Sequence, residues 1–178
     1  MRFFKQLFQT TLLLATMIVL TTQTANAKST TPEVRTIELN TTKGMPITIT
    51  VTPDGFLFDK FSGKAVLLDF FGPYCPPCLY EIPHLVEMQK SHKNKLQILG
   101  VQVQTQMSND DLNAFIKQKG INYPVVNLDY AWDLVSFIRA NTGWQGQIPY
   151  MLIFDKTGNL RRQFIGMTPN ESILKYVK

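Results

Sequence analysis

A continuous apolar run near the middle of the chain, followed almost at once by two cysteines, limits the possible folds more than any other feature. Residues 65–71 read AVLLDFF, and Cys75-Pro76-Pro77-Cys78 begins four positions later. An apolar run of strand length, without regular alternation of polar residues, is typical of a strand buried on both faces of a sheet. The segment therefore predicts a central strand covered by helices, with both cysteines just beyond its carboxyl end.

The remaining pattern places further strands and helices around this segment. Apolar residues at helical spacing predict a helix over 79–89, and residues 96–103 read as the next strand. The other expected elements are strands at 36–39 and 47–52 with a turn at Lys43-Gly44, a turn at 53–55, a helix from Ser108 to Lys119 ended by Gly120, an extended piece at 123–126, a helix capped by Asp129 and reaching Ala140, strands at 149–154 and 160–166, and a final helix from Asn170. This order predicts an α/β fold in which a central mixed sheet has helices on both faces and follows an N-terminal β-hairpin.

The first residues of the chain have the pattern of an export signal. Arg2 and Lys5 precede an apolar run over 12–20, and Ala25-Asn26-Ala27 has the small-x-small form that signal peptidase accepts. We therefore expect residues 1–27 to be a cleaved signal peptide and residues 28–178 to be one exported, soluble domain. The alternative is an uncleaved membrane anchor, although the apolar run is shorter than the roughly 20 residues that span a bilayer.

Composition narrows the function classes. The chain has 178 residues, of which 44% are hydrophobic and 17% charged, as in a globular domain. Two cysteines are too few for a disulfide-rich scaffold or for a four-cysteine zinc or iron–sulfur site. The formal net charge of +5 comes without a dense Lys/Arg block, so we expect no nucleic-acid partner.

The two cysteines follow a strand and open a helix, which is a favourable position for thiol chemistry. Unpaired backbone N–H groups and the positive end of the helix dipole stabilise a thiolate there. Pro76 suits the first helical position because its missing N–H would be unpaired anyway, and both prolines stiffen the loop. Cys78 lies one turn further in, so we expect it to be the more buried, resolving thiol.

Two other interpretations of the cysteine pair are weaker. His84 or His92 could complete a metal site, but neither obviously points back at the loop, and zinc needs four ligands at a fixed geometry. An inert structural disulfide across two residues would restrain little chain entropy. We therefore expect a redox pair with no bound metal and no cofactor.

At this point the chain resembles a known family. The segment Val66–Pro83 is similar to the active-site segment of the thioredoxin superfamily, and more closely to exported TlpA/ResA/CcmG-like thiol:disulfide oxidoreductases. Pro83 matches the helix-kinking proline of that family, and Glu81-Ile82-Pro83 matches its Glu-hydrophobic-Pro sequence. Gln147-Ile148-Pro149, a strand and the turn at 155–158 match its cis-proline loop, strand and turn.

The resemblance implies a three-layer thioredoxin-like fold with a helical insert. Cys75 would attack and Cys78 would resolve, while a cis Ile148-Pro149 peptide would expose the Ile148 backbone for pairing with a substrate peptide. Asp69 would be the buried carboxylate that relays a proton for the resolving cysteine. The alternative for Asp69 is a polar residue at a strand end.

The chain also departs from the family pattern. Tyr74 stands where the family usually has Trp, and Asp69 stands where many exported relatives have Asn. We expect Tyr74 to contact substrate. Core packing is the simplest interpretation of Trp132 and Trp144, and Trp144 is a further candidate for the substrate groove.

The function predicted from these observations is that of a periplasmic thiol:disulfide oxidoreductase. By resemblance it would be a monomeric reductase of exported protein disulfides, supplied with electrons by a membrane thiol-reductant carrier and serving cytochrome c maturation. A disulfide oxidase or isomerase is the alternative within redox chemistry. A copper metallochaperone is the alternative from another class, but no Met/His-rich tract supports it.

Overall fold

The apolar run at 65–71 forms the middle strand of a five-stranded sheet. The computed structural model describes residues 34–178, so the predicted signal peptide lies outside the described part. The sheet has the order β6-β5-β4-β7-β8, in which β5 and β6 run parallel to β4 while β7 and β8 form an antiparallel extension. Its strands are β4 (Ala65–Phe71), β5 (Leu96–Gln102), β6 (Val125–Val126), β7 (Tyr150–Phe154) and β8 (Leu160–Ile165). Every residue of β4 is buried, which confirms the predicted central strand.

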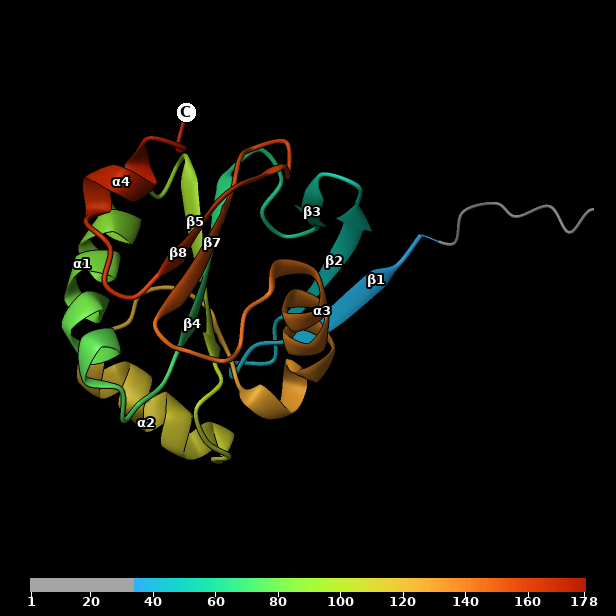
Figure 1. The fold of residues 1–178 in the computed structure, drawn as a ribbon. Coiled ribbons are helices and arrows are strands. Elements are labelled where there is room, and N and C mark those ends of the chain that lie inside the picture. The colour runs from blue at the N-terminus through green and yellow to red at the C-terminus, as the bar shows by residue number, and fades with distance from the viewer. Residues whose placement is uncertain (1–33) are drawn as a thin grey trace, which may run out of the picture. The chain divides into compact units, whose positions relative to one another are not determined.

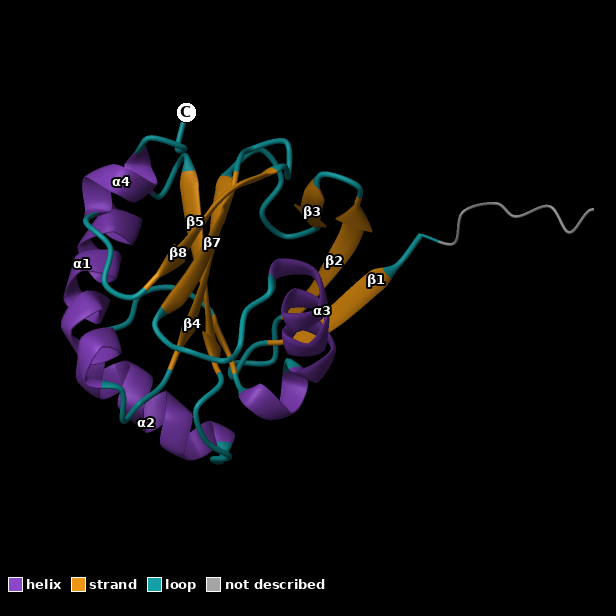
Figure 2. Ribbon diagram, viewed as in Figure 1, coloured by secondary structure: helices purple, strands orange, loops and turns teal. Residues whose placement is uncertain are grey.

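Two different layers cover the faces of this sheet (Figures 1 and 2). One layer consists of helices and the other combines a helix with a smaller sheet. The first contains α1 (Pro76–His92), α2 (Asn109–Lys119) and α4 (Asn170–Leu174), and the second contains α3 (Trp132–Thr142). The predicted mixed sheet with helices on both faces is confirmed. Within residues 34–178 no helix has the length and apolarity needed to cross a membrane.

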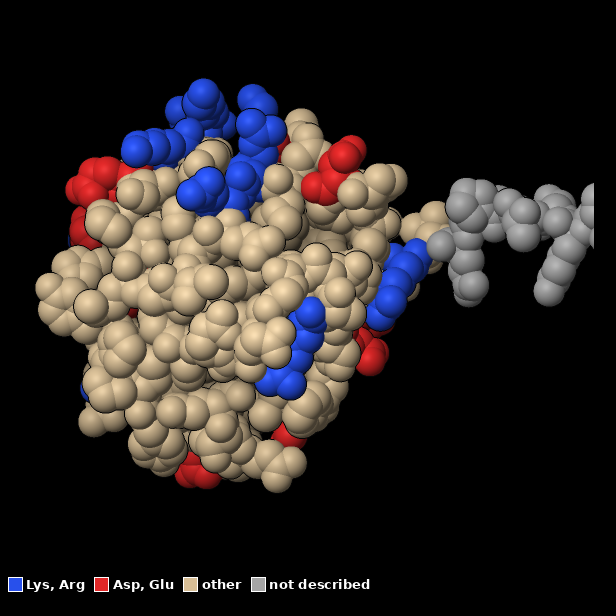
Figure 3. Space-filling view, in the orientation of Figure 1, with Lys and Arg blue, Asp and Glu red and all other residues tan. Residues whose placement is uncertain are grey.

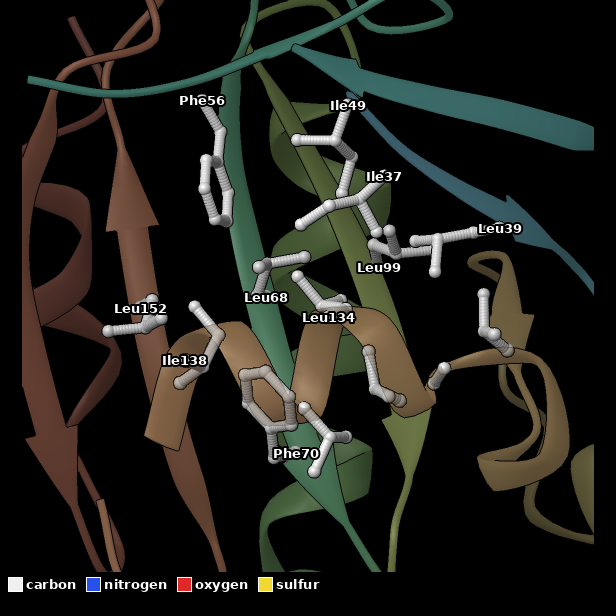
Figure 4. Close-up of a cluster of buried hydrophobic side chains, with 14 of the residues drawn as sticks. Ile37, Leu39, Ile49, Phe56, Leu68, Phe70, Leu99, Leu134, Ile138 and Leu152 are labelled. Carbon is white, nitrogen blue, oxygen red and sulfur yellow. The ribbon is translucent and has the colours of Figure 1, made fainter. Parts of the chain in front are cut away.

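The N-terminal sheet is larger than the predicted hairpin. Strands β1 (Thr36–Asn40) and β2 (Pro46–Thr52) pair as expected, and β3 (Gly55–Phe58) adds a third antiparallel strand. Phe56 and Phe58 alternate with less buried residues in β3, so both rings enter the core. Figure 4 shows Phe56 in this cluster. The prediction missed this strand because its four residues are too few to show a clear period.

Close backbone contacts join the two sheets. Phe56 N–H donates to the Gly158 carbonyl at 2.8 Å, and Leu160 N–H donates to the Asp54 carbonyl at 2.8 Å. The Phe56 ring stacks on Phe154 with centroids 5.0 Å apart. Gly158 has φ +88°, and a Cβ there would lie 2.4 Å from the Phe56 carbonyl oxygen. A glycine is therefore needed where the β7–β8 turn meets β3.

The predicted helix cap at Asp129, in the region between α1 and β7, is wrong. Asp129 does not cap a helix, because it lies inside a short 3₁₀ helix, η1 (Leu128–Tyr130). The capping residue is Asn127, whose side chain accepts from Leu128 N–H at 2.9 Å. The α-helix then begins at Trp132 with no side-chain cap. By contrast, Ser108 caps the start of α2 and Gly120 caps its end, as predicted.

Candidate active site

Cys75 and Cys78 lie where β4 ends and α1 begins. Cys75 is the N-cap residue of α1, and a disulfide joins its sulfur to that of Cys78. The Cys75 Sγ also accepts a hydrogen bond from Cys78 N–H at 3.3 Å. The side chains are 5% and 2% exposed, so Cys78 is the more buried of the two, as expected.

The start of α1 favours negative charge on the Cys75 sulfur. Its first turn has no acidic side chain, and its last turn has Lys90 and His92. Pro76 and Pro77 occupy the first helical positions, where a missing N–H costs least. The positive end of the helix dipole therefore acts on Cys75 without a competing acid in that turn. Pro83 lies within the helix, at the position that the resemblance implied.

A side chain from beyond β5 holds the loop that precedes the cysteines. Tyr74 N–H donates to Gln104 Oε1 at 2.8 Å, while the Tyr74 side chain is 73% exposed. The Gln104 side chain also fills the space beside Gly72, where a Cβ would lie 2.2 Å from Gln104 Oε1. Sequence reasoning missed Gln104, because its contact with the loop joins residues 30 positions apart.

The loop before β7 lies against the cysteine region. The Ile148–Pro149 peptide bond is cis, as the resemblance implied, and Ile148 packs against the cluster that contains both cysteines. The Pro149 carbonyl accepts from Gly166 N–H at 2.9 Å, which ties the loop to the end of β8. The position of Ile148 is thus compatible with the predicted contact with substrate, which stays a prediction.

The two tryptophans have different environments. Trp144 is 3% exposed, stacks on Tyr150 at 5.1 Å and donates from Nε1 to the Gln147 carbonyl at 2.7 Å. It packs in the core as expected, and this burial favours support of the cis-proline loop over direct contact with substrate. Trp132 is 52% exposed, so the expectation of core packing is wrong there. The buried face of α3 begins only at Leu134.

Asp69 is buried inside the sheet, in the strand that leads to the cysteines. It pairs with Gly100 of β5 and Met151 of β7, which makes the alternative of a residue at a strand end wrong. Its Oδ1 has no hydrogen-bond partner among the described residues. Burial, and secondarily the charge of Glu81, raise the pKa of Asp69 to about 8.

Glu81 is a second buried acid. The sequence predicted no role for it beyond its place in the Glu-hydrophobic-Pro match. Glu81 is 4% exposed, and its Oε1 accepts from Thr168 N–H at 2.8 Å while Oε2 has no partner among the described residues. Burial raises the pKa of Glu81 to about 7. The available signal was its spacing, since a residue three positions after Cys78 lies on the same face of the helix.

Exposed apolar side chains lie near this end of the molecule. Tyr80 is 67% exposed, and Met167 is 59% exposed. Both line a cavity of about 390 Å³ between α1 and the start of α4, which also includes Glu81 and the exposed His84. No group of three or more His, Cys, Asp or Glu side chains suited to hold a metal occurs among residues 34–178.

The opposite end of the sheet is basic. The sequence shows no dense Lys/Arg block, but the fold places Lys156, Arg161, Lys175 and Lys178 around one cavity of about 290 Å³. Figure 3 shows Lys and Arg side chains gathered at the end where the C-terminus lies. Phe154 pairs with Val66 at the start of β4, so the following turn lies away from the cysteines.

Comparison with known proteins agrees with this geometry. The model of the AhpC/TSA family matches residues 22–174. The chain is 29% identical over 118 residues to the thiol-disulfide oxidoreductase ResA of Bacillus anthracis, covering 65% of this chain and 63% of that protein. It is 27% identical over 119 residues to ResA of Geobacillus thermodenitrificans, covering 66% and 64%. The match thus spans less than two-thirds of the length of either relative.

Solved structures share the fold. A thiol:disulfide interchange protein of the thioredoxin family from Chlorobium tepidum superposes with a TM-score of 0.63 at 25% identity, covering 81% of this chain and 94% of that one. StoA from Bacillus subtilis superposes with a TM-score of 0.58 at 18% identity, covering 81% and 97%. These similarities confirm the predicted thioredoxin-like fold.

The burial of Asp69 leads to a prediction about stability. In the folded protein the pKa of Asp69 is about 8 against an ordinary value of 3.8, so the folded state binds more protons between these pH values. Its contribution to the free energy of unfolding therefore falls as pH rises from about 4 to about 8. Asp69→Asn should raise that free energy at pH 8 by a few kcal/mol, since one pKa unit is worth about 1.4 kcal/mol.

Urea unfolding at pH 4, 6 and 8 measures this effect. The variant should show a smaller loss of stability with rising pH than the unsubstituted protein. Asp129→Asn, which changes an exposed acid, is the matched control and should leave the slope unchanged. A slope that is equally steep in Asp69→Asn would show that Asp69 does not hold its proton in the folded state.

Proposed function

Because the chain belongs to the AhpC/TSA family and has a thioredoxin-like fold, we propose that it is a thiol–disulfide oxidoreductase that acts on exported proteins through Cys75 and Cys78. One observation supports this most directly. The Cys75–Cys78 disulfide lies at the start of a helix, with a cis-proline loop packed against its cluster and a buried carboxyl at Asp69 on the adjoining strand.

The reaction is a two-step exchange. In the reduced protein, the Cys75 thiolate attacks one sulfur of a substrate disulfide, forms a mixed disulfide and releases the other sulfur as a thiolate. The Cys78 thiol then loses its proton and attacks the Cys75 sulfur, which releases the second substrate thiolate. Two electrons pass to the substrate, and the Cys75–Cys78 disulfide re-forms.

The second step needs a proton acceptor in a buried place. Cys78 is 2% exposed, so bulk water has little access to its thiol. The pKa of Asp69 is raised to about 8 and that of Glu81 to about 7, so each carboxyl can gain and lose a proton near neutral pH. We assign Asp69 the role of acceptor, with Glu81 as the acid that adjusts it.

Exposed apolar groups beside the cysteines suit a protein substrate. Tyr74 directly precedes Cys75, and Tyr80 follows on α1, both with most of the ring exposed. Ile165 is 66% exposed at the end of β8, next to the residue that bonds Pro149. An extended substrate segment could pair with the Ile148 backbone and cover these side chains.

We further propose that the protein works as a reductase. When they are ionised, Asp69 and Glu81 oppose negative charge on the nearby sulfurs, so they stabilise the disulfide form relative to the dithiolate. A protein whose oxidised form is favoured gives up electrons readily. Reduction of exported proteins in an oxidising compartment would require a membrane thiol carrier as electron source, and cytochrome c maturation is one process that uses such a reductant.

Location and domain organisation complete the proposal. The N-terminal pattern ending at Ala27 supports export to the periplasm, with residues 1–27 removed and residues 28–178 acting as a soluble monomeric domain. The relatives named thiol-disulfide oxidoreductase ResA support the disulfide chemistry of the proposal.

Substitution of the attacking cysteine tests the activity itself. Cys75→Ala should lower the rate of insulin disulfide reduction by at least about a hundredfold, because removal of a covalent nucleophile leaves only the uncatalysed reaction. The assay follows insulin precipitation with dithiothreitol as reductant. Retention of activity in Cys75→Ala would exclude Cys75 as the nucleophile.

Substitution of the other cysteine distinguishes the two roles. Cys78→Ala also removes the disulfide but keeps Cys75, so a mixed disulfide with substrate should form and persist. Non-reducing electrophoresis of exported proteins, followed by mass spectrometry of the trapped species, measures this and identifies the substrates. Cys75→Ala is the matched control. Trapping by Cys75→Ala in place of Cys78→Ala would reverse the assignment.

Redox equilibrium tests the direction. A reductase should have a potential more negative than about −200 mV, whereas a strong oxidant lies near −120 mV. Titration with glutathione or dithiothreitol buffers, read by alkylation of free thiols, gives the value. A potential near about −120 mV would support the oxidase alternative and contradict the reductase.

A further inference from the structure

Four buried polar atoms without partners come from separate segments of the described chain, and three of them belong to acids or a phenol. The buried side-chain atoms that lack a hydrogen-bond partner within residues 34–178 are Asp69 Oδ1, Glu81 Oε2, Tyr123 Oη and Asn113 Oδ1. The Asn113 side chain is still bonded through Nδ2, to the Thr42 carbonyl. Buried polar groups are nearly always paired, so a group of unpaired atoms near a reaction centre requires an explanation.

The structure fixes Tyr123 beside the strand that pairs with Asp69. Asn122 Nδ2 donates to the Val86 carbonyl of α1 at 3.0 Å, and Gly100 N–H donates to the Pro124 carbonyl at 3.0 Å. The segment is therefore attached to α1 on one side of Tyr123 and to β5 on the other. Tyr123 is 6% exposed and packs in the buried cluster that contains residues of both elements.

Gly100 makes room for the ring. A Cβ at Gly100 would lie 3.3 Å from Tyr123 Cε2, so the ring covers this glycine closely. Gly100 is also the residue that pairs with Asp69 across the β4–β5 ladder. A side chain at position 100 would push against the ring, so the glycine lets Tyr123 pack over the residue that pairs with Asp69.

The charges in this group are all acidic. Burial and then the charges of Asp69 and Glu81 raise the pKa of Tyr123 well above its ordinary value, so the hydroxyl keeps its proton. The pKa of Asp69 is raised by burial and by Glu81, and that of Glu81 is raised by burial. The hydrogen bond from Thr168 N–H lowers the pKa of Glu81, against the effect of burial. Among the described residues, no cation affects the pKa of Asp69, Glu81 or Tyr123. Tyr123 thus has a hydroxyl that keeps its proton and can donate it in a hydrogen bond to an acid of this group.

We propose that Tyr123 is a positioning residue whose hydroxyl donates a hydrogen bond, directly or through one water molecule, to the ionised carboxylate of the Asp69–Glu81 pair. This inference rests on the proposed function, because it concerns the proton acceptor for Cys78. The donated bond stabilises the ionised carboxylate and so increases the fraction of protein in which the acceptor is ready.

The proton balance of the step is simple. The Cys78 S–H bond breaks and its proton moves to the Asp69 carboxylate, while the Cys78 sulfur keeps the electron pair and attacks Cys75 Sγ. The bond between Cys75 and the substrate sulfur then breaks, and the substrate leaves as a thiolate. Tyr123 loses no proton during this step, so its effect acts only through Asp69 and Glu81.

Tyr123→Phe tests the inference with little change of shape. The variant should move the pH midpoint of Asp69 ionisation upward by about 0.5 unit or more, because an ionised carboxylate loses a donor. Below that midpoint the rate of the second step should fall about threefold, since one unit corresponds to a tenfold change. Carbon-13 NMR of the Asp69 carboxyl, as a function of pH in the reduced protein, measures the midpoint without reference to activity.

Tyr150→Phe is the matched control. Tyr150 is also a buried tyrosine, but it lies in the cluster on the other face of the sheet, and its hydroxyl donates to Gln163 Oε1. Removal of the Tyr150 hydroxyl should leave the pH midpoint of Asp69 ionisation unchanged. Thermal unfolding of both variants is recorded in parallel to show that each is folded under the conditions of the pH titration. Gly100→Ala keeps the hydroxyl but displaces the ring, and it should raise the midpoint in the same direction.

The outcomes separate the two proposals. An unchanged or lowered midpoint in Tyr123→Phe would overturn the role of Tyr123, even if insulin reduction is fully retained. A raised midpoint in a protein that shows no disulfide exchange would support the hydrogen bond and contradict the proposed function. A raised midpoint together with a slower second step below it supports both.

Discussion

The burial of β4 on both faces determines where every reactive group of this protein lies. Its apolar residues pack against α1, α2 and α4 on one side and against α3 and the three-stranded sheet on the other. Because such a strand must end at the edge of the core, the next residues come to the surface and open α1. Cys75 therefore sits between a rigid interior and solvent, at the helix position that stabilises a thiolate.

The same burial makes Asp69 costly and useful. A carboxyl inside a sheet, with one oxygen unpaired among the described residues, favours the neutral form and destabilises the fold when it ionises. That cost is acceptable where a proton must be held and released near neutral pH. Glu81 and Tyr123 add a second acid and a donor to the same interior, so the proton affinity of Asp69 depends on three segments together.

The two ends of the molecule differ in chemistry. Exposed aromatic and apolar side chains such as Tyr74 and Tyr80 lie close to the cysteines, where an extended protein segment would bind. Basic side chains gather at the other end, around the turn that contains Lys156 (Figure 3). In the proposed function, a substrate at the redox end would therefore be recognised by apolar contact and backbone pairing more than by long-range attraction.

The sequence by itself determined the features that depend on neighbours along the chain. The buried strand at 65–71, the cysteines at a helix start, and the caps Ser108 and Gly120 follow from local pattern and backbone preference. The cis Ile148–Pro149 loop followed from family resemblance. Asn127 as a cap and the third strand of the small sheet were not predictable in this way, because packing decided between several weak local signals. Only the tertiary structure brought Glu81, Tyr123 and Gln104 to the site, since burial and contact between distant segments give these residues their chemistry.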